Sequence, residues 1–262
     1  MNGADDPFVV GGKTLSSRLL LGTGKYASKQ AMEDAIRASG TALVTVAMRR
    51  IDVERHEDNL LEHIPPHVVL MVNTSGARNA GEAVEIARLF REAGGGDWVK
   101  IEIMTDSRWL LPDNQETVKA TRTLAAEGFV VLPYMYPDLY AVRALEDAGA
   151  AAVMPLGSPI GSCKGVVTRD FVRITVEETS LPVIVDAGIG APSHAVEAME
   201  LGCAAVLVNT AVACASEPAA MAEAFALAVR AGRLAYRAGL ASGASESSAS
   251  SPLTGFLFED PS

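Results

Sequence analysis

One apolar segment carries two ionisable residues whose spacing indicates chemistry. Residues 98–104 read WVKIEIM. Side chains alternate across a β-strand, so Lys100 and Glu102 share one face while valine and isoleucine form the other. If the apolar face packs against helices, Lys100 and Glu102 point into the interior of the fold. Burial lowers the pKa of a lysine, and a neutral amine is what Schiff-base formation with a carbonyl requires.

A structural ion pair is the alternative role for this lysine, because a buried lysine needs a partner. The candidate partners are Glu102 and Asp186, which ends the apolar run PVIVD at 182–186. Interior ion pairs stabilise a fold poorly compared with apolar packing, which favours catalysis by Lys100. Asp186 would lie at the end of its strand, where barrel enzymes place catalytic groups, and could also cap the following loop.

Two short segments that follow apolar runs are suited to binding phosphate. They are Ala187-Gly188-Ile189-Gly190 and Asn209-Thr210-Ala211. In a barrel, backbone N–H groups and a helix N-terminus after the seventh and eighth strands form the usual phosphate site. The alternative for the first segment is a tight turn in which glycine supplies a positive φ.

The segment GTGKYA at 22–27 fits the looser form of the dinucleotide-binding pattern. The next apolar run ends in Met48-Arg49-Arg50 rather than in the acidic residue that binds an NAD ribose. Two arginines suit a 2′-phosphate, so an NADP-dependent enzyme stays open as an alternative. The pattern of a nucleotide P-loop is not met.

The elements that must position these residues form one alternating array. Eight apolar runs begin near Leu19, Leu43, Val68, Trp98, Phe129, Ala151, Pro182 and Ala204. Between them lie segments with helical periodicity, and glycines at the expected helix ends: Gly40, Gly94, Gly128, Gly149 and Gly202. Buried strands alternating with helices imply a parallel sheet covered on both faces, and eight such units predict an α/β (β/α)8 TIM barrel. A doubly wound sheet is the alternative.

The predicted helix starts and the two ends of the chain complete this organisation. Asn79 and Ser193 are expected to cap helices, the former with Glu82 in capping-box spacing. Residues 8–18 predict a β-hairpin around two glycines that closes the lower end of the barrel. We expect residues 1–240 to form a single domain, and residues 241–262, which begin with a low-complexity stretch, to form a mobile tail.

Composition excludes several classes of protein. The 22 basic and 32 acidic residues give a net charge of −10, which argues against binding nucleic acid or an anionic membrane through net charge. Cys163, Cys203 and Cys214 form no disulfide or zinc pattern, which fits a reducing cytoplasm. No apolar run is long enough to span a bilayer, so we expect a cytoplasmic protein without membrane contact.

In addition, the chain resembles the thiazole synthase family of thiamin biosynthesis along residues 17–239. The stretches that carry the resemblance are SRLLLGTGKY, VKIEI, LLPDNQET, VVLPY, MPLGSPIGS, PVIVDAGIG, AAVLVNTAV and AGRLAYRAG. The resemblance implies a (β/α)8 barrel that uses 1-deoxy-D-xylulose 5-phosphate, dehydroglycine and the C-terminal thiocarboxylate of a small sulfur-carrier protein. It places the imine on Lys100 and the acid/base carboxylates on Glu102 and Asp186. It assigns the sugar-phosphate contacts to Gly161, Ala187, Gly188, Asn209 and Thr210.

Two loops depart from the pattern of that family. Cys163-Lys164 stands where a glycine and a glutamine-like residue are expected, and YMYPDLYAVRAL follows the fifth predicted strand in place of a stretch with two adjacent acids. We expect the rim segment 134–137 to form part of the docking surface for the carrier. We also expect a homo-oligomer, a dimer or a tetramer, and a reaction that calls for no metal or redox cofactor.

Other functions remain open on the residues alone. A class I aldolase would use the same imine and the same phosphate loops to break a carbon–carbon bond. A non-catalytic phosphosugar-binding protein would keep the barrel without the chemistry. The joint presence of Lys100, Glu102 and Asp186 argues against the second of these.

Overall fold

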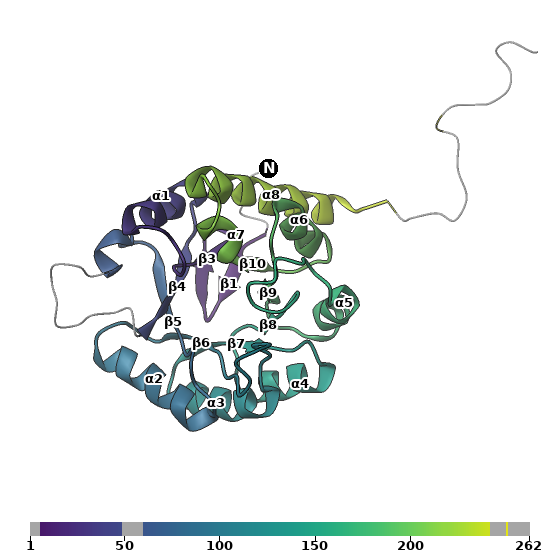
Figure 1. Ribbon diagram of the computed structural model, residues 1–262. Helices are drawn as coiled ribbons and strands as arrows, with labels where there is room; N and C mark the ends of the chain where they lie inside the picture. Colours follow the sequence, from purple (N-terminus) through teal and green to yellow (C-terminus); the bar gives the residue numbers. More distant parts are fainter. Residues whose placement is uncertain (1–5, 49–59, 242–249, 251–262) are drawn as a thin grey trace, which may run out of the picture.

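Eight parallel strands form the centre of the computed structural model, which describes residues 6–48, 60–241 and Ser250. The strands are β3 (Leu19–Gly22), β4 (Leu43–Ala47), β5 (Val69–Asn73), β6 (Trp98–Ile101), β7 (Val130–Met135), β8 (Met154–Pro155), β9 (Ile184–Asp186) and β10 (Ala205–Val208). Their order in the sheet is β8-β7-β6-β5-β4-β3-β10-β9. Parallel bridges between Val153 and Val183 and between Leu156 and Asp186 join the two ends. The ring closes (Figure 1), which confirms the predicted barrel over the doubly wound sheet.

The longer helices surround the ring of strands, whereas the short α7 (Thr210–Ala213) lies within the circle of helices in this view (Figure 1). In chain order the helices are α1 (Lys29–Ser39), the 3-10 helix η4 (Leu60–His63), α2 (Ala80–Glu92), α3 (Asn114–Ala126), α4 (Leu139–Asp147), α5 (Arg169–Glu178), α6 (Pro192–Glu200), α7 (Thr210–Ala213) and α8 (Pro218–Ala238). The five glycines predicted at helix ends all have a positive φ. Asn79 caps α2 as predicted, with its side chain accepting from the N–H of Glu82.

The predicted cap at Ser193 is wrong. Ser193 lies inside the first turn of α6, and the N-cap position is Ala191, which makes no side-chain cap bond. Pro192 explains the difference, because its fixed φ suits the first helical position and so places Ser193 inside the first turn. The helix therefore begins at Pro192 without a capping side chain.

Two apolar clusters hold the barrel together. The larger lies between the strands and the surrounding helices, and the smaller fills the interior of the barrel. The hairpin of β1 (Phe8–Val10) and β2 (Lys13–Leu15) adds Phe8, Val10 and Leu15 to the interior cluster. These side chains pack with residues at the starts of the strands, so the hairpin closes the end of the barrel opposite the site, as predicted.

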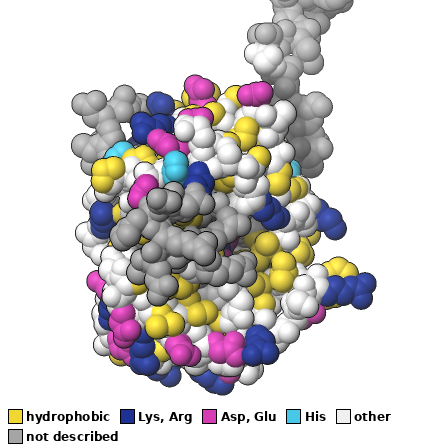
Figure 2. Space-filling view, turned by 60° about the vertical axis from the view of Figure 1, so that its left-hand side comes forward, with side chains coloured by type: hydrophobic (Ala, Val, Ile, Leu, Met, Phe, Trp, Pro, Cys, Tyr) yellow, Lys and Arg dark blue, Asp and Glu magenta, His cyan; other side chains and the backbone are white. Residues whose placement is uncertain are grey.

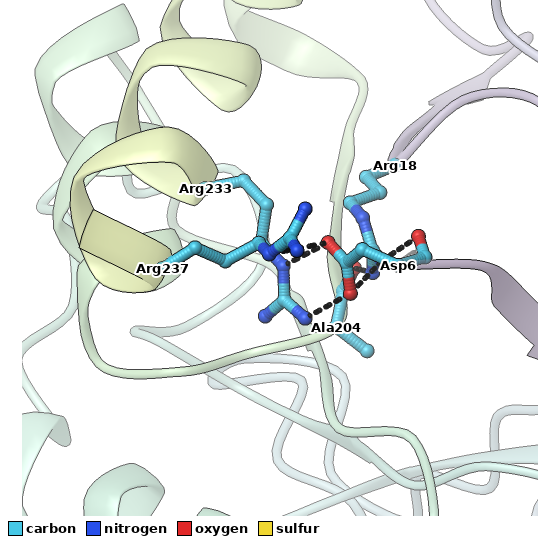
Figure 3. Close-up of polar contacts among 5 residues, drawn as sticks. All are labelled: Asp6, Arg18, Ala204, Arg233 and Arg237. Carbon is cyan, nitrogen blue, oxygen red and sulfur yellow. Dashed lines mark hydrogen bonds and ion pairs between the residues drawn. The ribbon is translucent and has the colours of Figure 1, made fainter. Parts of the chain in front are cut away.

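A cluster of ionic contacts fastens the chain before the hairpin to α8 (Figure 3). Asp6 accepts from Arg233 Nε at 2.8 Å and from Arg233 Nη2 at 2.7 Å. Arg18 Nη2 lies 3.0 Å from the same carboxylate, and Arg18 Nη1 donates to the carbonyl of Ala204 at 2.8 Å. Arg237 Nε lies 4.0 Å from Asp6. One carboxylate thus joins the N-terminal segment, the start of the barrel and the last helix.

The surface that faces forward in Figure 2 is uneven in polarity. Hydrophobic side chains gather to the right of the grey atoms, whereas charged side chains of both signs lie along the lower edge. Among the described residues, no helix is long and apolar enough to cross a bilayer. The predicted mobile tail, 241–262, lies almost entirely outside the described residues.

We predict that Asp6→Asn lowers the free energy of unfolding at pH 7 by about 1–3 kcal/mol, because charge-assisted hydrogen bonds are lost. The hydrogen bond from Arg233 lowers the pKa of Asp6 from 3.8 to about 2. The stabilisation is therefore complete above the unfolded-state pKa and is lost as the pH falls through the folded-state value. Urea denaturation at several pH values measures the difference between wild type and variant, which should shrink as the pH falls from about 4 to about 2.

The control is Asp147→Asn, at an exposed position of α4. It should leave the unfolding free energy nearly unchanged. A loss in Asp6→Asn that stayed constant down to the lowest pH would contradict the ionic origin of the effect.

Candidate active site

Lys100 lies between two carboxylates in the interior of the barrel. Its Nζ is 2.7 Å from Glu102 Oε1 and also contacts Asp186 Oδ2. The three residues are only 5%, 6% and 4% exposed, in that order. Val99 and Ile101 on the opposite face of β6 join the outer cluster beneath the helices. The alternation predicted for this strand is therefore confirmed.

Burial and charge act in opposite directions on this group. Burial lowers the pKa of Lys100, but the charges of Asp186 and Glu102 together outweigh it, so the pKa is raised. Burial raises the pKa of Asp186, although the charge of Lys100 opposes it. The expectation that burial keeps Lys100 neutral is thus wrong, because two carboxylates share its environment. Lys100 carries its proton in this state, and Asp186 is the carboxylate prepared to accept one.

Neighbouring strands hold the group in place. Thr74, at the end of β5, is fully buried; its Oγ1 accepts from the N–H of Glu102 at 2.8 Å and donates to the carbonyl of Glu102 at 3.0 Å. Tyr134 on β7 is also fully buried, and its ring centre lies 5.5 Å from Lys100 Nζ. Sequence reasoning missed Thr74, whose only signal was its place directly after the apolar run VVLMVN.

A pocket of about 280 Å³ opens above Lys100, among the carboxyl ends of the strands. The predicted residues that line it are Lys100, Glu102, Asp186, Ala187, Gly188, Ile189, Asn209 and Thr210. Residues that were not predicted also line it, among them Lys25, Thr45, Asn73 and Ser75. Cys163, one of the departures from the family pattern, lines it as well. Parallel strands end on the same side of the sheet, which explains how distant segments meet here.

The loop after β9 presents its backbone to the pocket. Ala187 and Gly188 have φ of 66° and 79°. Within the described chain, the N–H groups of Gly188 and Ile189 donate to no protein acceptor. A side chain on Gly188 would meet Ser158 Oγ at 1.9 Å, so a larger residue there would disrupt the loop as well as any anion site. These N–H groups can serve a ligand.

Two predicted contacts, Gly190 and Gly161, do not line the pocket. The N–H of Gly190 donates to His194 Nδ1 at 3.2 Å, so it serves the start of α6. Gly161 lies at the rim, where a Cβ would meet Lys25 Nζ at 3.4 Å. The arginines of the NADP alternative, Arg49 and Arg50, lie outside the described residues.

Asn209 lines the pocket, and its side chain also contacts the loop after β3. In the amide orientation that satisfies its neighbours, its nitrogen donates to the carbonyl of Gly24 at 2.7 Å and to that of Gly22 at 3.3 Å. Gly22 has no room for a side chain, because a Cβ there would lie 2.7 Å from Asn209 Cβ. Asn209 therefore fixes the position of this loop.

Comparisons with known proteins show which family the chain belongs to. The family model described as thiazole biosynthesis protein ThiG matches residues 9–252. A thiazole synthase of Pelotomaculum thermopropionicum is 62% identical over 253 residues, which cover 97% of this chain and 99% of the relative. A thiazole synthase of Alkaliphilus metalliredigens is 61% identical over 252 residues, which cover 96% of this chain and 98% of the relative.

Solved structures add the fold. The crystal structure of the Amycolatopsis orientalis BexX/CysO complex contains a chain with 34% identity and a TM-score of 0.83, covering 92% of this chain and 100% of that chain. Thiamine phosphate pyrophosphorylase from Pyrococcus furiosus has a TM-score of 0.58 at 16% identity, covering 82% of this chain and 96% of that chain, and shares the fold alone. With the family match and the full-length relatives taken together, the chain belongs to the thiazole synthase family of thiamin biosynthesis.

Proposed function

We propose that this protein forms the thiazole phosphate of thiamin from 1-deoxy-D-xylulose 5-phosphate, dehydroglycine and the thiocarboxylate of a sulfur-carrier protein, through an imine on Lys100. One observation carries the proposal: a buried amine lies between two carboxylates at the base of a pocket at the mouth of the barrel. A structural ion pair would not need such a pocket.

The first step follows from the charges of the group. Lys100 is protonated and must lose a proton before its amine can attack the sugar ketone. Asp186 touches Nζ and has a raised pKa, so it is suited to take that proton. The same carboxyl can then protonate the hydroxyl that leaves as water when the imine forms.

The imine then acts as an electron sink. It draws electrons from the adjacent carbon and so acidifies the neighbouring C–H bonds. Glu102 and Asp186 contact the nitrogen from the ends of β6 and β9, so each can move protons as the carbonyl character migrates along the sugar. Addition of the carrier's sulfur and condensation with dehydroglycine would complete the ring.

The proposed phosphate site is the backbone of residues 187–189 together with Thr210. The unpaired N–H groups of Gly188 and Ile189 border the pocket, and a phosphate accepts hydrogen bonds from such groups. This assignment keeps the reactive end of the sugar near Lys100.

The partner would dock on the rim of the barrel mouth. Tyr134 and Met135 are fully buried and so cannot take part, which corrects the expected docking segment. The exposed aromatic and apolar side chains here, which we name the rim patch, are Trp109, Leu111, Tyr136 and Tyr140. Asn114 joins its two loops, donating to the carbonyl of Tyr136 at 2.9 Å and accepting from its N–H at 3.0 Å.

The related chain from Amycolatopsis orientalis was solved as a complex of two proteins, BexX and CysO, which supports a protein partner for this chain as well. We further propose that the protein works in the cytoplasm as a dimer or tetramer. The exposed Leu227 and Leu234, seven residues apart on α8, are suited to such a contact.

We predict that Lys100→Arg abolishes the adduct that borohydride traps with 1-deoxy-D-xylulose 5-phosphate. Arginine keeps the positive charge between the two carboxylates but forms no imine. Lys100→Ala should lose the adduct too, and should also be less stable at neutral pH, because two buried carboxylates are left without a counter-ion. Peptide mass mapping locates the adduct, and thermal unfolding follows stability.

The control for Lys100 is Lys164→Arg, at the loop that departs from the family pattern. This variant should keep the full adduct yield. An adduct that persisted in Lys100→Arg, or that mapped to another lysine, would refute the imine assignment. Release of a cleaved sugar fragment in place of a thiazole would support the class I aldolase instead.

We predict that Tyr136→Asp weakens binding of the organism's own carrier while the trapped adduct on Lys100 stays unchanged. The new charge would be desolvated in the complex without a partner. Tyr136 is 42% exposed, so the free protein should tolerate the change. Titration calorimetry measures the affinity, and Leu89→Asp, at an exposed position of α2, is the control. Equal affinity in wild type and Tyr136→Asp would place the docking surface elsewhere.

A further inference from the structure

Lys25 lies between Thr210, which belongs to the proposed phosphate site, and Gly161 at the rim of the pocket. Its Nζ donates to Thr210 Oγ1 at 3.1 Å. The same atom lies 3.4 Å from the position that a Cβ on Gly161 would occupy. Lys25 also lines the pocket. Its ammonium group therefore stands at the rim, between the loop after β8 and the start of α7.

The backbone of Lys25 is held in a conformation that lysine rarely adopts. Its φ is 69°, in the left-handed region that favours glycine or asparagine. Residues held in this region cost free energy and persist only where the surroundings fix them. The surroundings here are the two bonds from the Asn209 amide to the carbonyls of Gly22 and Gly24. A turn alone would be better served by glycine, so the lysine side chain needs another explanation.

Charge provides that explanation. Apart from the thiol of Cys163, the ionisable side chains of the described residues that line the pocket are Lys25, Lys100, Glu102 and Asp186. Lys100 is paired with both carboxylates, and a fully ionised group of these three carries a net charge of −1. A phosphate monoester brings a charge of about −1.5 to −2 at pH 7, which this group repels.

Lys25 brings a positive charge that is not paired within the pocket's central group. It contacts no carboxylate among the described residues, and its hydrogen bond to Thr210 leaves ammonium protons for a ligand. The N–H groups of Gly188 and Ile189 offer hydrogen bonds but no formal charge. A cation at this rim would hold the phosphate away from the carboxylates and near those N–H groups.

We propose that Lys25 binds the phosphate of the sugar substrate and selects the phosphorylated over the unphosphorylated sugar. This inference rests on the proposed function. The competing role for Lys25 is a tether that only fastens its loop to Thr210.

The test compares Lys25→Asn and Lys25→Arg with wild type. Asparagine tolerates the left-handed backbone and removes the charge, whereas arginine keeps the charge. Borohydride trapping is measured against the concentration of 1-deoxy-D-xylulose 5-phosphate and, separately, of 1-deoxy-D-xylulose. Lys25→Asn should raise the half-saturating concentration of the phosphosugar by about 10- to 100-fold, the loss expected for a hydrogen bond to a charged group.

The half-saturating concentration of the unphosphorylated sugar should stay the same in Lys25→Asn, and Lys25→Arg should remain close to wild type with both sugars. If Lys25 were only a tether, Lys25→Asn would change the half-saturating concentrations of both sugars equally. An equal rise for both sugars, or no rise for the phosphosugar, therefore overturns the inference. Thermal unfolding of both variants verifies that the fold is retained.

Calorimetry with inorganic phosphate separates this inference from the proposed function. If wild type forms no adduct with the phosphosugar, the proposed function fails, and the phosphate titration still tests Lys25. Weaker phosphate binding in Lys25→Asn than in wild type supports the inference. Equal phosphate binding in the two proteins overturns it.

Discussion

The contact of one ammonium group with two carboxylates in the interior of the barrel constrains the rest of this structure. Taking three charges out of water is costly, and their attraction compensates only where geometry and hydrogen bonds are good. Glu102 directly follows β6, the strand that carries Lys100, but Asp186 ends β9, so the group exists only when the barrel closes. Thr74 holds the backbone of Glu102 from a third strand. The strand register is therefore also the geometry of the site.

The two ends of the barrel have different tasks. At the end where the strands begin, the hairpin fills the interior with apolar side chains, and the Asp6 cluster fastens the first residues to α8. At the other end, loops leave a pocket lined by charged, short polar and apolar side chains together with backbone. In barrels of this kind, catalytic residues generally lie at the end where the strands finish, and the opposite end generally serves stability. The fold alone does not specify the reaction: thiamine phosphate pyrophosphorylase from Pyrococcus furiosus, which is named for a different reaction, shares it at 16% identity.

Lys100 and Lys25, which both line the pocket, differ in the charge that they present to a ligand. Lys100 is neutralised within its own group, so it adds no net attraction for an anionic substrate. Lys25 stands at the rim on a strained backbone that Asn209 supports. Asn209, which the family resemblance assigns to the substrate, thus also holds the loop that carries Lys25. Such division between contact and support is what a precise site requires.

Local patterns in the sequence determined the eight strands, the helix-ending glycines, and the inward direction of Lys100 and Glu102, because side-chain alternation and helix punctuation depend on neighbouring residues. Motifs shared with a known family determined the family. Only the tertiary structure decided the raised pKa of Lys100, the burial of Tyr134 and the meeting of Lys25 with Thr210. Each of these depends on residues brought together from distant strands by closure of the barrel, and no local period encodes that register.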